Sequence, residues 1–170
     1  MKKCYGAEDD ELSGDSPKGE EAAVAPRASF SDYVAYAAEC VGKVQDSVLQ
    51  EFLLCRLASL GNYTAEPEQW LLPAVDFLDE LTALGDYPAE VMSLLDTLAQ
   101  SLREQVEAAG AELLASPCWD PATQRAVKVN FVLPAGEAPV VVKAFATGVK
   151  LAGCLLRKQE VELDMPHTSS

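Results

Sequence analysis

The sequence predicts an α+β protein, in which a long N-terminal helix and a short helical bundle precede a small antiparallel β-domain. Up to Gly110, apolar residues recur at helical spacing. Beyond Gly110 they alternate with polar residues, as in strands with one buried face. Because the helical and strand patterns are segregated along the chain, they favour α+β over an alternating α/β fold.

Residues 1–29 are predicted to form a disordered acidic tail. They are rich in Gly, Ser, Pro, Ala, Glu and Asp and contain almost no large apolar residues. Such a segment cannot bury enough surface to offset the entropy lost on ordering. Residues 166–170 are expected to form a short flexible tail.

The first helix is expected from Phe30 to Leu60, ending at Gly61-Asn62, a typical C-terminal cap. Apolar side chains recur at every seventh position, namely Val34, Val41, Val48 and Cys55. This spacing is typical of a coiled-coil seam and favours self-association, with the three valines at a dimer interface.

Two further helices are expected between Glu66 and Gly85 and between Asp86 and Gly110, with Pro73 inside the first of them. We therefore assign residues 30–111 to a helical dimerisation region. The first helix of the pair carries an apolar group, Leu71, Leu72, Val75 and Leu78. Two interpretations remain open for this group: a dimer interface, or packing on a neighbouring helix within one chain.

Residues 112–165 are expected to form the β-domain. Alternating or β-branched runs predict strands at 127–133, 140–142, 151–156 and 159–163. Gly148 and Gly153 are expected at bends or bulges.

Charge divides along the same boundary. The chain carries a net charge of −14, and residues 30–112 hold three basic residues against fifteen acidic ones. Residues 113–170 hold six basic residues against five acidic ones. This balance argues against a nucleic-acid partner and favours the β-domain as the contact surface, because less like-charge repulsion opposes contact there.

Catalytic and metal-binding chemistry find little support in the sequence. The single histidine, His167, lies close to the C-terminus, which argues against histidine-dependent catalysis and histidine-ligated metals. Asp76, Asp79 and Glu80 are interpreted as a solvated helix face, because nothing gives them the distinct environments that a catalytic carboxylate pair needs. We expect no catalytic residue, metal or cofactor.

The compartment is expected to be the cytoplasm. No stretch approaches the roughly 20 apolar residues that span a bilayer, and no apolar segment follows the two N-terminal lysines as a secretory signal would require. The five cysteines are odd in number and none lie in a Cys-x-x-Cys pair, so free thiols in a reducing compartment are the simplest account.

Three stretches suggest a family. Leu71 to Leu81 reads LLPAVDFLDEL, Cys118 to Pro121 reads CWDP with Gln124 following, and Gly148 to Arg157 reads GVKLAGCLLR. In this order and spacing they resemble motifs of the GrpE family, the nucleotide exchange factors of DnaK-type chaperones. The resemblance covers a little over half of the chain.

The resemblance implies a homodimeric co-chaperone whose β-domain binds the nucleotide-binding domain of DnaK and promotes ADP release, without chemistry of its own. The residues it implicates in chaperone binding are Lys150, Gly153, Cys154, Arg157, Trp119 and Gln124. Lys150 and Arg157 have the alternative of a solvated face. Trp119 has that of a local core plug, and Cys154 that of a small buried hydrophobe or a reactive thiol.

A second functional class stays open. Cys154 stands where the family has the first arginine of a Gly-Arg pair, and the region of Val48 to Leu54 is unusually apolar. These departures would suit a GrpE-derived adaptor, or a secretion-type chaperone, that binds a different protein without exchange activity.

Overall fold

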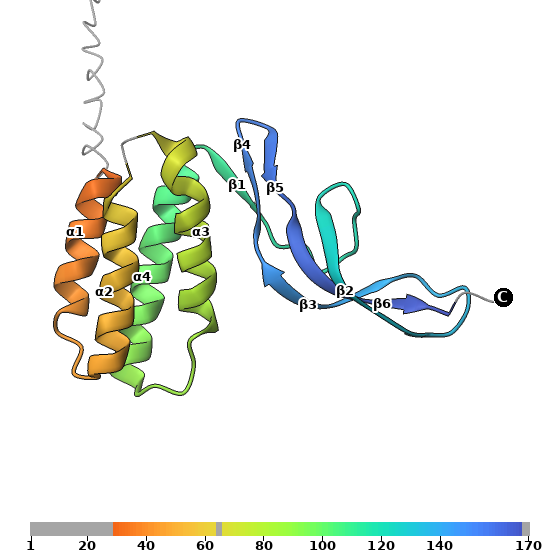
Figure 1. Cartoon of the computed structure of the whole chain (residues 1–170), viewed down its shortest axis with the longest axis horizontal. Helices are drawn as coiled ribbons and strands as arrows, with labels where there is room; N and C mark the ends of the chain where they lie inside the picture. Colours follow the sequence, from red (N-terminus) through yellow and green to blue (C-terminus); the bar gives the residue numbers. More distant parts are fainter. Residues whose placement is uncertain (1–28, 64–65, 168–170) are drawn as a thin grey trace, which may run out of the picture.

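The computed structural model describes residues 29–63 and 66–167, so the predicted tails at 1–28 and 168–170 lie outside the described residues. Within these described ranges, four helices come first and six strands follow (Figure 1). The helices are α1 (Phe30–Val41), α2 (Ser47–Gly61), α3 (Pro67–Ala83) and α4 (Ala89–Ala108). The strands are β1 (Ala111–Leu114), β2 (Gln124–Leu133), β3 (Val140–Ala146), β4 (Gly148–Leu151), β5 (Cys154–Arg157) and β6 (Gln159–Pro166). The expected α+β class is confirmed.

The four helices lie side by side and pack their apolar faces against one another within a single chain (Figure 1). Each helix contributes fully buried side chains to one core, among them Val41, Leu53, Leu71 and Leu98. Burying side chains of this size stabilises a fold by roughly 1.5–3 kcal/mol each. The bundle is therefore closed by the chain itself.

The single long helix predicted over residues 30–60 is wrong, because the chain breaks into α1 and α2 between Val41 and Ser47. Gly42 is the C-cap of α1, and the side chain of Asp46 accepts hydrogen bonds from the amides of Val48 and Leu49 to start α2. The Gln50 side-chain amide donates to three carbonyls at the end of α1 and in the loop after it. These local caps satisfy backbone groups that a continuous helix would have paired internally.

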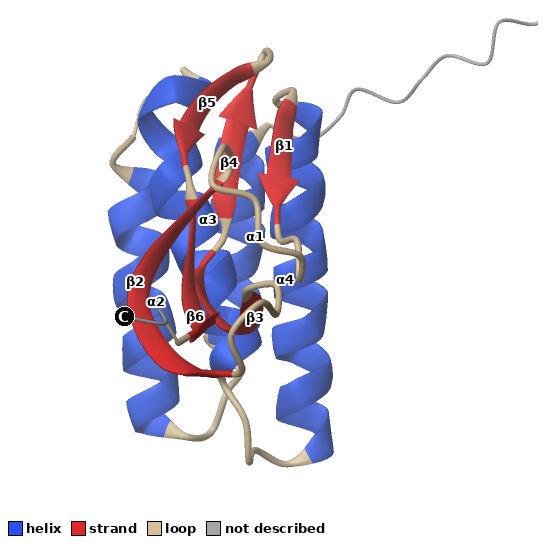
Figure 2. Cartoon of the chain, turned by 90° about the vertical axis from the view of Figure 1, so that its right-hand side faces the viewer, coloured by secondary structure: helices blue, strands red, loops and turns tan. Residues whose placement is uncertain are grey.

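The six strands form two small sheets rather than one antiparallel sheet (Figure 2). Sheet A has the strand order β1-β4-β5 and is antiparallel throughout. Sheet B has the order β2-β6-β3, in which β6 pairs in parallel with β2 and antiparallel with β3. The β region is therefore mixed, and the expectation of a purely antiparallel domain is corrected.

The predicted strand at residues 151–156 is instead the tip of a hairpin between β4 and β5. Ala152 and Gly153 both adopt positive φ angles, 50° and 80°, and reverse the chain. Two consecutive left-handed residues are typical of tight hairpin turns whose twist matches that of the strands.

Sheet A attaches the β-domain to the bundle, and sheet B extends away from it (Figure 1). Val149 is fully buried in the same hydrophobic core as the helices, and Leu113 and Leu151 pack against that core. Sheet B has a separate small core around Val161 and Leu163. None of the helices in the described part of the chain combines the length and apolar composition needed to cross a bilayer.

Candidate partner-binding surface

The third motif folds into the β4–β5 hairpin. Gly148 begins β4 at a point where an added Cβ would lie 2.5 Å from the amide nitrogen of Gln159, so only glycine fits there. At the hairpin tip, Gly153 has open space around it, and Cys154, Leu155 and Leu156 are exposed. The hairpin thus presents a small apolar surface to solvent.

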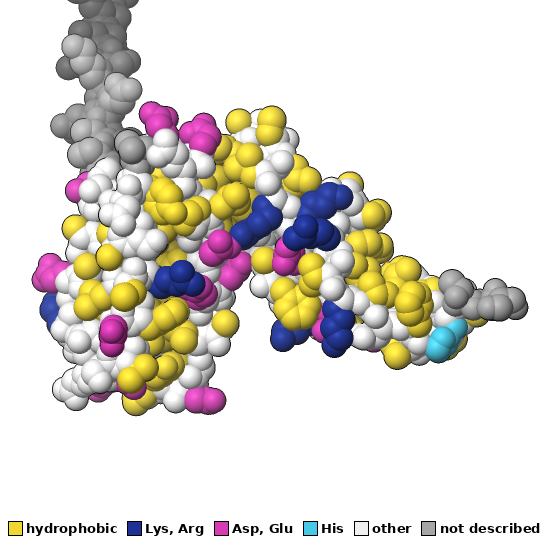
Figure 3. Space-filling view, viewed as in Figure 1, with side chains coloured by type: hydrophobic (Ala, Val, Ile, Leu, Met, Phe, Trp, Pro, Cys, Tyr) yellow, Lys and Arg dark blue, Asp and Glu magenta, His cyan; other side chains and the backbone are white. Residues whose placement is uncertain are grey.

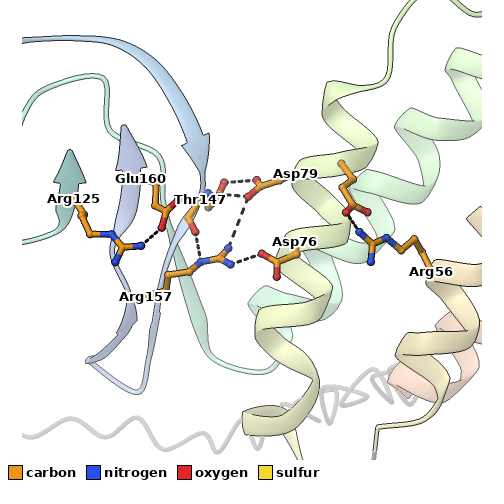
Figure 4. Close-up of polar contacts among 8 residues, drawn as sticks. Arg56, Asp76, Asp79, Arg125, Thr147, Arg157 and Glu160 are labelled. Carbon is orange, nitrogen blue, oxygen red and sulfur yellow. Dashed lines mark hydrogen bonds and ion pairs between the residues drawn. The ribbon is translucent and has the colours of Figure 1, made fainter. Parts of the chain in front are cut away.

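Arg157, a predicted chaperone contact, is instead engaged within the chain (Figure 4). Its guanidinium forms an ion pair with Asp76 and lies 3.8 Å from a carboxylate oxygen of Asp79. Its Nε also donates to the carbonyl oxygen of Thr147 at 2.9 Å. The side chain is only 20% exposed, so in this arrangement it contributes little surface to a partner.

Asp79 completes this network from α3. Its two carboxylate oxygens accept hydrogen bonds from the Thr147 amide at 2.8 Å and from the Thr147 hydroxyl at 2.5 Å. Thr147 is the single residue between β3 and β4. We call the four residues Asp76, Asp79, Thr147 and Arg157 the latch, because they join α3 to the connection between sheets B and A.

The latch corrects the interpretation of Asp76 and Asp79 as a merely solvated face. Both residues hold groups that lie more than 65 positions away in the chain. No local signal in the sequence identifies such partners, since an acidic pair on a helix looks the same whether or not a distant arginine meets it. Glu80, by contrast, pairs with Arg56 inside the bundle.

The second motif forms the loop that leads into β2, and its glutamine is structural. Gln124 is 2% exposed and bonds to the Asp120 amide, the Ser116 carbonyl and the Gln159 side chain. Asp120 accepts from the Ala122 amide and the Thr123 hydroxyl, and these bonds hold the pKa of its carboxyl below the usual value. Gln124 is therefore inaccessible to a partner.

The other predicted contact residues are more accessible. Lys150 is half-buried on β4 and lies 3.7 Å from the carboxylate of Glu112 on β1. Trp119 is half-buried in the loop before β2, and this exposure is compatible with both a chaperone contact and a local core plug. Cys154 is exposed and is a free thiol, so it is not a buried hydrophobe.

The residues assigned to a dimer interface are mostly occupied inside the bundle. Val41, Leu71, Val75 and Leu78 are at most 2% exposed, and Val34 and Leu72 are partly buried against the same core. Val48, in contrast, is 79% exposed, because the break after α1 rotates it away from the seam. Packing within one chain is thus the interpretation that the structure favours for Leu71 to Leu78.

Sheet B has two chemically different faces, because residues paired across a ladder share a face. One face carries all the charged residues of the sheet, an asparagine and two apolar residues, namely Arg125, Lys128, Asn130, Glu160, Glu162, Asp164, Lys143, Val140 and Ala146. The opposite face is apolar beyond the Gln124–Gln159 pair and carries Ala126, Val129, Phe131, Val161, Leu163, Met165, Val141 and Ala144.

The apolar side chains of sheet B were not singled out from the sequence as contact residues. Four of them on β2, namely Val127, Val129, Phe131 and Val132, are 41–59% exposed. Figure 3 shows hydrophobic side chains interspersed with lysine and arginine over the visible face of the β-domain. Exposed apolar groups gathered in this way mark interaction surfaces. The alternation in β2 was visible in the sequence, but it was interpreted as a buried face.

Comparisons with known proteins add no relative to this picture. Neither a scan of protein-family models nor a search of curated proteins found a match for the chain. Among the described residues there is also no group of three or more His, Cys, Asp or Glu side chains placed to hold a metal ion.

Proposed function

We propose that this protein is a GrpE-like co-chaperone that binds the nucleotide-binding domain of a DnaK-type chaperone through its β-domain and promotes ADP release. The observation that carries the proposal is the exposed apolar surface of a β-domain that projects from a helical bundle. The three motifs that resemble the family fall on α3, on the loop entering β2, and on the β4–β5 hairpin.

The mechanism requires only differential binding. A factor that binds the open form of a nucleotide-binding domain more tightly than the closed form shifts the population toward the open form, by no more than that difference in affinity. ADP and the factor then weaken each other's binding by the same factor. No residue of this chain has to touch the nucleotide.

The direct test measures release of a fluorescent ADP analogue from the DnaK-type chaperone of the same organism. We expect this protein to accelerate release at sub-stoichiometric amounts. Cys154→Arg, which restores the arginine of the family motif at an exposed position, should increase the acceleration. Cys55→Arg is the matched control, because Cys55 is also an exposed free thiol but lies on α2.

A second candidate function is that of an adaptor that binds a protein partner without nucleotide exchange. Two observations favour it: the latch engages Arg157, and the bundle buries most of the side chains that were predicted for a family-like dimer. Binding to the chaperone without faster ADP release would support the adaptor. The absence of both binding and acceleration would contradict the co-chaperone.

A further inference from the structure

The outer edge of β2 is an open strand edge. Sheet B has the order β2-β6-β3, so β2 pairs on one side only. Apart from the ladder with β6, residues 125–132 make no backbone hydrogen bond to another described residue. An edge of this kind presents unpaired amide and carbonyl groups that can template a further strand.

The usual defence of an open edge is weak here. Natural edges are often blocked by lysines that project past the strand. On β2, however, the Nζ of Lys128 lies 2.7 Å from Glu162, and Arg125 pairs with Glu160, both on the central strand β6. Both cations therefore lean inward over the polar face.

The register of β2 limits how long an added strand can be. Its pairing with β6 shifts between Ala126 and Lys128 and again between Phe131 and Leu133. Such bulges bend a strand and interrupt its regular edge. The regular stretch between them, Lys128 to Phe131, leaves room for about one short strand.

The other edge of sheet B is less open. The C-terminal end of β3 faces α2 and α3 across a groove of about 560 Å³, which Phe145 and Ala146 line together with Arg56 and Glu80. A strand added along that end of β3 would have to enter this groove beside the bundle. Among the described helices and strands, only β6 packs extensively against β2.

The charges of sheet B indicate the chemistry of the occupant. All three acidic residues of the sheet lie on the central strand β6, whereas β2 and β3 carry only cations and uncharged residues. Arg125 and Lys128 keep 65% and 60% of their side-chain surface exposed. A neighbouring strand would be best matched by acidic residues facing these cations and by apolar residues beside Val129 and Phe131.

We propose that the edge of β2 binds, by strand addition, an extended segment of a partner protein in which acidic and apolar residues alternate. This goes beyond the proposed function, because it names the binding surface and the chemistry of the bound segment. It does not depend on which protein carries that segment. Backbone hydrogen bonds would supply affinity, and the two faces of the sheet would supply specificity.

Two other occupants fit less well. A second copy pairing β2 with β2 would bring cationic strands together, since β2 carries Arg125 and Lys128 and no acid. The chain's own acidic segment Glu8 to Glu11 has four acids in succession. It would therefore place carboxylates on both faces of a strand, including the apolar one.

The test titrates the full-length protein into a fluorescein-labelled peptide of alternating valine and glutamate, about eight residues long, and follows fluorescence anisotropy. We expect saturable binding. Methylating two adjacent central amides, which blocks both edges of the peptide without changing its side chains, should weaken binding about tenfold or more. Replacing glutamate by lysine in the peptide should weaken it comparably.

On the protein side, Phe131→Thr keeps a strand-forming residue but removes the apolar side chain, and should weaken peptide binding about tenfold. Val48→Thr on α2 is the matched control, because Val48 is more exposed than Phe131 but lies in the bundle. Circular dichroism checks that both variants fold. If Phe131→Thr misfolds, the two modified peptides test the proposal on the unaltered protein.

Three outcomes would overturn the proposal. The first is equal binding of the methylated and unmethylated peptides, and the second is equal binding of the acidic and basic ones. The third is peptide binding that appears only after Glu8, Asp9, Asp10 and Glu11 are changed to their amides, since the chain's own segment would then occupy the edge. None of these depends on ADP release, so failure here is distinguishable from failure of the proposed function.

Discussion

Individual residues determine the junction between sheets A and B, where the chain passes from one sheet to the other through Thr147 and Lys158. Gly148 lies at this junction. The atoms nearest to its missing Cβ include the Gln159 amide nitrogen and, at 3.1 Å, the Arg157 carbonyl oxygen. Both are backbone atoms and cannot rotate away as a flexible side chain would. The close approach of β4 to the start of β6 therefore depends on the absence of a side chain.

Gly148→Ala is expected to destabilise the protein by about 1–3 kcal/mol, because the added methyl group forces backbone to shift. Urea denaturation followed by circular dichroism measures the change. Gly85→Ala is the control, since nothing lies within 4 Å of the Cβ added there. Equal stability of Gly148→Ala and the unaltered protein would contradict the close contact.

Glu162 supplies a prediction about pH. Hydrogen bonds from Lys128 and Asn130 hold the pKa of its carboxyl below the usual value, and the charges of Lys128 and Lys143 act in the same direction. Because the pKa is lower in the folded state, the stabilisation from this carboxylate is present above the unfolded-state pKa. It is lost as the pH falls through the folded-state pKa.

We therefore expect a carbon-13 NMR titration to place the Glu162 pKa below the usual value of a glutamate side chain, and Lys128→Met to raise it. Arg125→Met is the control, because Arg125 pairs with Glu160 instead. A Glu162 titration that Lys128→Met leaves unchanged would contradict the assigned cause.

At the level of elements, the helices show which signals a sequence carries and which it hides. The seven-residue spacing of Val34, Val41 and Val48 is compatible with one continuous helix, and it predicted one. The break depends on local capping: Gly42 ends α1, and the Asp46 side chain accepts hydrogen bonds from two backbone amides at the start of α2. A cap occupies one or two positions, so a periodic pattern that spans several turns outweighs it in a sequence-based assignment.

Asp46→Ala is expected to destabilise the protein by about 1 kcal/mol, because it leaves the Val48 and Leu49 amides without their acceptor. Thermal denaturation measures the loss. Gln45→Ala, at the preceding exposed position, should change stability by less than about 0.5 kcal/mol. If the two variants unfold at the same temperature, Asp46 does not determine where α2 starts.

The strands show the same division between local and distant information. Alternation located β2, and the β-branched run Val140 to Val142 located β3. Gly153 was expected at a bend, but the hairpin turn that it forms with Ala152 and the parallel pairing of β2 with β6 were not predicted. Which strands become neighbours depends on residues far apart in the chain, and no pattern within one strand records that choice.

At the scale of the whole molecule, the prediction and the structure differ most in what covers the apolar faces of the helices. The sequence showed that Leu71, Val75 and Leu78 would be buried, but periodicity is the same whether a second chain or another helix of the same chain covers them. The structure uses α1, α2 and α4 of the same chain. The candidate site changed accordingly: Cys154, one of the predicted contact residues, is exposed at the hairpin, whereas Arg157 is engaged by the latch and Gln124 is buried.

The latch yields the prediction that concerns the molecule as a whole. It ties α3 to Thr147, through which sheet B connects to sheet A. Asp79→Ala removes the two carboxylate oxygens that accept hydrogen bonds from Thr147. It should lower the free energy of unfolding by about 1–3 kcal/mol. Sheet B should then sample a wider range of orientations relative to the bundle.

Pulsed electron paramagnetic resonance measures this directly, with spin labels at the native Cys55 on α2 and at Glu137→Cys in the turn after β2, and with the other four cysteines changed to serine. We expect Asp79→Ala to broaden the distance distribution between the labels. Glu80→Ala is the control, because the ion pair of Glu80 is with Arg56 on α2 and not with a residue of the β-domain. An unchanged distribution for Asp79→Ala would mean that the β-domain is oriented without Asp79, by the remaining Arg157–Asp76 ion pair and the apolar contacts of Val149, Leu113 and Leu151.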